Sequence, residues 1–303
     1  DPFHNGHAWQ LAQAKALGAE RVAVAMSCSL VQRGALPLLP EAVRTRSALT
    51  CGADLVFALP APCACAGAEA FARAGVALLA AAGCDGLVFG AETPDAALLM
   101  EAAELLDSDS YRAALKAQLA GGARSFAAAR QAAAAQLASD ERVAALLDKP
   151  NNNLAVEYCR AIRSLAPRME AYPLPRQGAD HGEALHSAHG QFASASALRK
   201  LWAEGGADAV APYVPEAVFP LYQEAYAAGQ YTDFSAAGRC ELALLRSACR
   251  GKAPFADIRG VSEGLEHRLE AAVRTSTTYD ELLDALTTVR YPRARMRRLA
   301  MDA

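Results

Sequence analysis

Short apolar runs alternate with amphipathic segments in the first part of the chain, and this pattern predicts strands that alternate with helices. Apolar runs of strand length occupy residues 21–26, 54–59 and 86–90. Helical periodicity marks residues 8–17, 41–49 and 67–82. Strands that alternate with helices form a parallel sheet covered on both faces. We therefore predict an α/β fold with a Rossmann-like parallel sheet.

Helical patterns dominate the rest of the chain. Residues 94–147 predict helices without a strand, residues 148–153 break this pattern, and a new helix is expected over about residues 154–165. Residues 169–174 predict a further strand, followed by a loop up to residue 191 and a helix that begins at Ser194. Beyond residue 205 we expect only helices. The pattern predicts an α/β domain at residues 1–205 and an all-helical C-terminal domain at residues 206–303.

Both ends of the sequence lie within predicted elements. A helix that starts at a phosphate-binding turn normally follows a buried strand, and no apolar run stands before Asp1. We expect the first strand of the sheet to precede Asp1. Residues 299–303 stop within a helical pattern, so we expect the helical domain to continue beyond Ala303.

Composition narrows the class of protein. The 303 residues are 53% hydrophobic, and no apolar stretch is long enough to cross a bilayer, so we predict a cytoplasmic protein without membrane contact. The net charge of −3 requires any contact with nucleic acid to come from a local basic patch. The 8 cysteines lack zinc-type spacing, and the histidines at 181, 186 and 189 fit no familiar ligand pattern, so we predict no structural metal.

The segment His4-Asn5-Gly6-His7 carries the strongest chemical signal. It places two imidazoles at the start of a predicted helix, where free backbone N–H groups and the helix dipole favour an anion. Gly6 lets the backbone approach a ligand closely. This arrangement suits a nucleoside triphosphate attacked at its α-phosphate, where negative charge develops. The alternative is a helix start that happens to carry two surface histidines.

Loops after the predicted strands face the same side as these histidines. Arg33 could contact phosphate there, or be an ordinary solvated arginine. Gly90 could let a nucleoside pack on the backbone, and Glu92 is favoured as a cap for a helix that starts near Pro94. The amides at 151–153 could bind an adenine edge or cap a helix.

A second anion site is predicted where the helix after residue 193 begins. Ser194, Ser196 and Arg199 lie on one helical turn. An N-cap role would explain Ser194 but would leave the other two residues unexplained. Near the C-terminus, a basic run without an acidic residue predicts a contact with a phosphate backbone, or a solvated helix end: Arg290, Arg293, Arg295, Arg297 and Arg298.

These motifs carry a family resemblance when they are taken in order. His4-Asn5-Gly6-His7 resembles the histidine signature of the HIGH-type nucleotidyltransferase superfamily, and residues 194–199 resemble its second motif. The succession of motifs at residues 2–7, 31–34, 52–56, 89–92, 150–152, 176–179 and 193–196 is similar to the tRNA(Met) cytidine acetate ligase family. The resemblance covers nearly the whole chain. It implies a HIGH-type nucleotidyltransferase fold with an ATP-binding domain at residues 1–205 and a tRNA-contacting domain at residues 206–303.

The resemblance also implies an activity and a set of residues. Acetate and ATP would form acetyl-adenylate and pyrophosphate, and the acetyl group would pass to the wobble cytidine of elongator tRNA(Met). His4 and His7 would be catalytic, and the basic run would bind tRNA. Magnesium is expected with the triphosphate, and no protein partner is implied. ATP would be bound by Phe3, His4, Gly6, His7, Gly90, Asn152, Arg176, Ser196 and Arg199.

The sequence departs from the family pattern at two places. Asp1 stands where the family usually has asparagine, and Pro40-Glu41 where it commonly has Asp-Lys. Two other functions therefore stay open at this stage. The chain could be an adenylyltransferase that acts on a small phosphorylated metabolite, or a non-catalytic protein that binds ATP and RNA.

Overall fold

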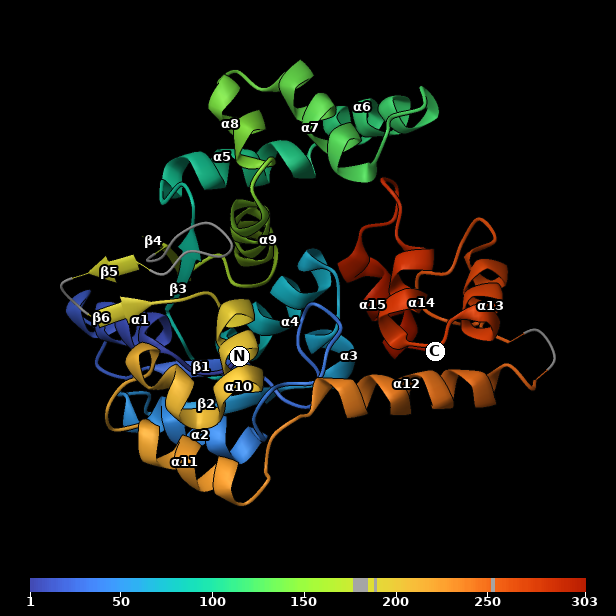
Figure 1. Cartoon of the computed structure of the whole chain (residues 1–303). Helices are drawn as coiled ribbons and strands as arrows, with labels where there is room; N and C mark the ends of the chain where they lie inside the picture. Colours follow the sequence, from blue (N-terminus) through green and yellow to red (C-terminus); the bar gives the residue numbers. More distant parts are fainter. Residues whose placement is uncertain (177–184, 188–189, 252–253) are drawn as a thin grey trace.

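The computed structural model describes residues 1–176, 185–187, 190–251 and 254–303 (Figure 1). Its first part alternates helices and strands in the predicted order: α1 (Asn5–Ala16), β1 (Ala23–Ser27), α2 (Glu41–Thr50), β2 (Leu55–Leu59), α3 (Ala61–Ala64), α4 (Ala68–Ala81) and β3 (Gly86–Ala91). A helical insertion follows: α5 (Ala96–Asp107), α6 (Asp109–Ala120), α7 (Phe126–Leu137), α8 (Glu141–Leu146) and α9 (Pro150–Leu165). The chain then returns to β4 (Glu170–Pro175). The α/β alternation is confirmed.

The strands pair in parallel, as the alternation requires. β1 pairs with β2, and β3 pairs with β4, as separate two-stranded sheets. Helix α1 contacts the sheet of β3 and β4, because the Gln10 side-chain amide donates to the carbonyl oxygen of Val88 in β3 at 3.0 Å. Residues of both β1 and β3 line the large cavity described below. The expected strand before Asp1 stays a prediction.

The remaining elements are mostly helical. Two short antiparallel strands, β5 (Leu185–Ser187) and β6 (Gly190–Phe192), lie where an uninterrupted loop was predicted, so that prediction is wrong. Strands of three residues are too short to show a hydrophobic period. After them come α10 (Ala195–Val210), a 3₁₀ turn η1 (Ala211–Tyr213), α11 (Phe219–Ala227), α12 (Phe234–Ala248), α13 (Leu265–Thr275), α14 (Tyr279–Leu286) and α15 (Arg293–Met301). Among the described helices, none combines the length and apolarity that crossing a membrane needs.

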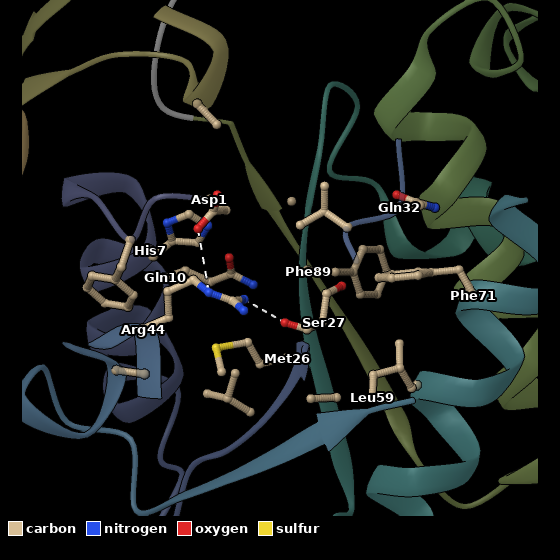
Figure 2. Close-up of a pocket in the computed structure, with 18 of the residues that line it drawn as sticks. Asp1, His7, Gln10, Met26, Ser27, Gln32, Arg44, Leu59, Phe71 and Phe89 are labelled. Atoms are coloured by element: carbon tan, nitrogen blue, oxygen red, sulfur yellow. Dashed lines mark hydrogen bonds and ion pairs between the residues drawn. The ribbon is translucent and has the colours of Figure 1, made fainter. Parts of the chain in front are cut away.

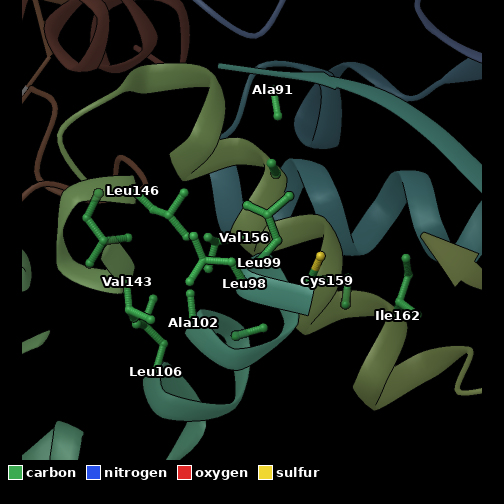
Figure 3. Close-up of a cluster of buried hydrophobic side chains, with 14 of the residues drawn as sticks. Ala91, Leu98, Leu99, Ala102, Leu106, Val143, Leu146, Val156, Cys159 and Ile162 are labelled. Carbon is green, nitrogen blue, oxygen red and sulfur yellow. The ribbon is translucent and has the colours of Figure 1, made fainter. Parts of the chain in front are cut away.

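The hydrophobic core has several centres. The first joins β3, α4, α5 and α9, with Leu99 and Val156 fully buried in it (Figure 3). A second unites α12 to α15 around Leu269 and Leu283. A third packs Leu38 against residues of α10 and α11. This third cluster includes residues on both sides of position 205, and the predicted domain boundary there stays a prediction.

The start of α9 differs from the expectation. The helix begins at Pro150, not near residue 154, because proline fits the first helical position, where its missing N–H is not needed. The Glu92 carboxylate accepts from the backbone N of Asn151 at 3.2 Å and of Asn152 at 2.6 Å. Glu92 therefore caps α9. The expected cap near Pro94 is instead Asp95, which accepts from Leu98 N at the start of α5.

The Glu92 contact predicts a measurable loss of stability. Glu92→Ala removes a carboxylate that satisfies free N–H groups at a helix start, and we expect it to lower the free energy of unfolding by about 1–3 kcal/mol. Urea denaturation measures this change. Glu204→Ala is the matched control, because Glu204 is exposed on α10 and pairs only loosely with Lys200 at 3.9 Å. Equal stability of the two variants would contradict the capping role.

Candidate active site

A cavity of about 2380 Å³ opens where β1 and β3 end and where α1 and α10 begin (Figure 2). It exceeds the size of an ordinary small-molecule pocket. Its lining continues between β1 and β3 and reaches residues of α12, α14 and α15. The predicted catalytic residues His4 and His7 line the cavity at the start of α1.

His4 and His7 meet at the first turn of α1. His4 is the N-cap residue, and its Nδ1 accepts from the backbone N of Gly6 at 3.0 Å. The Nδ1 of His7 accepts in return from the backbone N of His4 at 3.2 Å, which completes a capping box. The ring centroids are 4.1 Å apart. A Cβ at Gly6 would come within 2.8 Å of His4 Cε1, so glycine is needed to keep this ring in place.

The capping box assigns the ring protons. A neutral imidazole has one N–H donor and one acceptor nitrogen, and in both rings Nδ1 accepts. The proton of each neutral ring therefore lies on Nε2. Both rings are partly buried, and loss of water lowers the pKa of His4 and brings the pKa of His7 to about 3. Near neutral pH, both residues thus offer an uncharged Nε2–H donor.

The residues before this turn are held in place at Asp1, which contacts both Arg44 and Arg199. Arg199 Nη1 donates to the Asp1 carbonyl oxygen at 2.7 Å, and the Asp1 carboxylate accepts from Leu38 N. Arg44, only 4% exposed, lies 3.6 Å from Asp1 Oδ1 and donates to the carbonyl oxygen of Ser27 at the end of β1 at 2.6 Å. The acidic residue at the position of the family asparagine is therefore paired with a buried arginine.

A second support comes from α11. The hydroxyl of Tyr222, fully buried, donates to the Phe3 carbonyl oxygen at 2.7 Å. The Phe3 ring stacks on the His7 ring, with the centroids 5.4 Å apart. No sequence pattern pointed to Tyr222, because its role depends on a contact between residues more than two hundred positions apart.

The structure brings most of the predicted ATP residues to one cavity. Its lining includes Phe3, His4, Gly6, His7, Gly90, Arg176, Ser196 and Arg199. Asn152 is the exception: it is 1% exposed, and its side chain is hydrogen-bonded to Thr93 at both the amide oxygen and the amide nitrogen. The neighbouring Asn151 lines the cavity instead. A nucleoside contact by Asn152 stays a prediction, and its observed contacts hold the segment after β3.

The expected second anion site is partly a capping motif. Ser194 Oγ accepts from Ala197 N at 3.2 Å, so Ser194 is the N-cap of α10, as its alternative interpretation held. Ser196 is exposed at the cavity, and its Oγ lies 3.0 Å from that of Ser194. Arg199 reaches the cavity one turn later. Arg176 packs over Gly90, where a Cβ would lie 3.6 Å from Arg176 Cγ.

The residues available to a metal ion are few. Within the described residues, no three histidine, cysteine, aspartate or glutamate side chains form a group that could hold one. Asp1, three residues before His4, already contacts Arg44 and Leu38 N through its carboxylate. His181 and His189 lie outside the described residues, as does the side chain of His186.

Comparisons with known proteins agree with this geometry. The family described as HIGH Nucleotidyl Transferase matches residues 1–303. A tRNA(Met) cytidine acetate ligase from Syntrophotalea carbinolica is 36% identical over 99% of this chain and 71% of its own length. The enzyme of that name from Acetivibrio thermocellus is 32% identical over 99% of the chain and 74% of its own length.

This chain belongs to the tRNA(Met) cytidine acetate ligase family. The same conclusion follows from solved structures. Thermotoga maritima TmcAL without ligand matches with a TM-score of 0.91 at 30% identity, over 99% of this chain and 72% of that one. The same protein bound with alpha-thio ATP matches with a TM-score of 0.89 at 29% identity, with the same coverage. The predicted fold class is confirmed, and the chain is a member of a ligase family.

The basic run near the C-terminus does not form one free surface. Arg290 pairs with Glu263 at 2.6 Å, and Arg293 pairs with Asp280 at 2.6 Å. Acidic side chains distant in the sequence therefore pack beside these two residues, and their contact with a phosphate backbone stays a prediction.

The other arginines of the run have separate surroundings. Arg295 lies 4.9 Å above the Tyr291 ring. Arg298 donates to the Gln32 carbonyl oxygen at 3.3 Å, and burial lowers the pKa of its guanidinium. Arg297 lines the same cavity as the histidine turn. A contact between this run and tRNA stays a prediction.

The lowered pKa of His7 predicts a pH dependence of stability. Between the ordinary pKa of 6.5 and about 3, the unfolded chain binds a proton at His7 that the folded chain does not. Stability is therefore full above pH 6.5 and falls as the pH drops, by about 1.4 kcal/mol per pH unit from this residue. Urea denaturation at about pH 7 and about pH 5 measures the loss, which should be smaller by about 2 kcal/mol in His7→Gln.

Glutamine is the suitable replacement in this test, because its side-chain oxygen can still accept from His4 N in the capping box. An equal loss of stability with falling pH in the wild-type protein and the variant would show that His7 is not a buried neutral ring.

Proposed function

We propose that this protein is an ATP-dependent acetate ligase that forms acetyl-adenylate and then acetylates the wobble cytidine of elongator tRNA(Met) in the cytoplasm. The observation that supports it most is the capping box of His4 and His7. It leaves a neutral Nε2–H donor on each ring, and both residues line the cavity. The relatives' names supply acetate, tRNA and the acceptor base. The ligand of Thermotoga maritima TmcAL supports ATP as the nucleotide.

In the first step, a carboxylate oxygen of acetate attacks the α-phosphorus of ATP and pyrophosphate leaves. Charge grows on the phosphate oxygens in the transition state, and prearranged donors stabilise it. The Nε2–H groups of His4 and His7 and the free N–H groups of α1 serve this role. Arg199 and Ser196 at the start of α10 hold the departing pyrophosphate. No protein nucleophile is needed, because positioning and electrostatics carry the step.

In the second step, the exocyclic amine of the cytidine attacks the acetyl carbonyl carbon, AMP leaves, and the amine loses a proton. Gly90 and Arg176, which line the cavity beside β3, are proposed to contact the nucleotide while this happens. Neutral histidines suit this step as well, since their donors keep contact with the phosphate of the leaving AMP.

Magnesium is expected to enter with the triphosphate. The metal prefers oxygen ligands and keeps several waters, so phosphate oxygens and water can supply most of its ligands. It would supply charge neutralisation at the phosphates. The Asp1 carboxylate is paired with Arg44, and we assign it a structural role.

Pyrophosphate release tests the proposal directly. The wild-type protein should release pyrophosphate from ATP when acetate is present and should acetylate methionine tRNA. In His7→Ala the rate should fall by about a hundredfold to a thousandfold, because one prearranged donor is lost. Circular dichroism checks that the fold is retained, since losing the cap costs only about 1 kcal/mol.

Other outcomes of this assay distinguish other functions. Pyrophosphate release with a phosphorylated metabolite but not with acetate would indicate a metabolite adenylyltransferase. Binding of ATP and RNA without any pyrophosphate release would indicate a non-catalytic protein. A wild-type rate in His7→Ala would refute the phosphate role of that ring.

The basic run predicts how tRNA affinity responds to charge. Arg290 forms an exposed ion pair with Glu263, which contributes little in water and which an RNA phosphate can replace, and Arg295 lies over the Tyr291 ring. Charge reversal at both positions should weaken tRNA binding and reduce the slope of log affinity against log salt by about 1–2. Filter binding at several salt concentrations measures both quantities. Unchanged affinity and slope would show that these arginines are merely solvated.

A further inference from the structure

Helix α15 packs against the loop that follows β1, although the two segments are more than two hundred residues apart in the sequence. Val31 and Ala35 form a β-bridge in this loop, and Gly34 stands in it with φ of +72°. A Cβ at Gly34 would lie 2.5 Å from the backbone N of Arg298 and 2.9 Å from Cβ of Arg297. The helix therefore packs directly on this glycine. Its contact brings Arg297 to the edge of the nucleotide cavity.

Arg297 joins two other arginines there. Arg33 comes from the loop after β1, Arg199 from α10 and Arg297 from α15, and all three line the cavity. Burial lowers the pKa of Arg199, and the charges of Arg33 and Arg297 lower it further. The Arg199 guanidinium is thus close enough to both of the others to be repelled by them. Such an arrangement favours an anion between them.

The neighbours of these arginines leave that charge largely uncompensated. Within the described residues, neither Arg33 nor Arg297 forms an ion pair, in contrast to Arg290 and Arg293. Glu241 of α12 is near enough to Arg297 to feel its charge: burial raises the pKa of Glu241, and the arginine opposes that rise. The Asp1 carboxylate is paired with Arg44, so Glu241 alone does not balance the charge of the three arginines.

We propose that Arg297 binds the β- and γ-phosphates of the nucleotide together with Arg33 and Arg199, so that the helical C-terminal region completes the triphosphate site. This inference rests on the proposed function for the identity of the nucleotide. The polyphosphate of ATP and the pyrophosphate product share the chemistry that the three guanidinium groups recognise. Arg297 therefore differs from the rest of the basic run, in which RNA phosphates are the expected ligand.

Binding of ATP, AMP and inorganic pyrophosphate, measured by calorimetry without acetate or tRNA, tests the assignment. Arg297→Ala should weaken ATP and pyrophosphate binding by about tenfold or more and leave AMP binding unchanged, because AMP lacks the β- and γ-phosphates. Lys200→Ala is the matched control. Lys200 also carries one positive charge, next to Arg199 in the sequence, but its side chain is 79% exposed and pairs with Glu204.

A second variant tests the packing that places Arg297. Gly34→Ala forces α15 away from the loop, so it should weaken ATP binding in the same direction while AMP binding stays at the wild-type value. Wild-type affinity for ATP in Arg297→Ala would overturn the proposal. So would unchanged pyrophosphate binding in that variant, and a loss of tRNA affinity, measured separately by filter binding, would then assign Arg297 to RNA. The absence of acetate from this assay keeps its outcome independent of the acetate-ligase proposal.

Discussion

The candidate site depends on the capping box at the start of α1. Two hydrogen bonds to the Nδ1 atoms of His4 and His7 satisfy backbone donors of the first turn and at the same time fix the rings. The same bonds leave the proton of each ring on Nε2. A local solution to the free N–H groups of a helix end thus produces a pair of neutral donors. Desolvation keeps these donors neutral, because it lowers the pKa of both imidazoles.

This turn is held by residues from distant parts of the chain. Arg44 and Arg199 contact Asp1, and Tyr222 contacts the Phe3 carbonyl oxygen. Each contact ends on the few residues before the helix, so α2, α10 and α11 together determine where the rings lie. Asp1 illustrates the consequence. A carboxylate close to a phosphate site would repel the ligand, but beside the Arg44 guanidinium its charge is compensated.

Much of this arrangement could be predicted from local sequence. Apolar runs located the strands β1 to β4, and the His4–His7 spacing located the helix start. Each of these signals is contained within a few consecutive residues. Long-range contacts left no such signal. Glu92 caps α9 rather than the next helix in the sequence, and the Asn152 side chain is hydrogen-bonded to Thr93. Neither contact could be predicted, because the end of β3 and the start of α9 are far apart in the sequence. The basic run is divided for the same reason, as Glu263 and Asp280 reach it from other helices.

Helices from both the first and the last part of the chain line the cavity in which we propose that the nucleotide binds. α1 and α10 supply the histidine turn and Arg199, and α15 supplies Arg297 to the same cavity. The central claim is that both imidazoles are neutral, carry their proton on Nε2 and donate it to the phosphates. Nitrogen-15 NMR of the two rings near pH 7, without and with ATP, measures this most directly. We expect unprotonated Nδ1 and protonated Nε2 in the free protein, and a shift of both Nε2 signals when ATP binds. Protonated Nδ1 atoms, or Nε2 signals that do not respond to ATP, would contradict the claim.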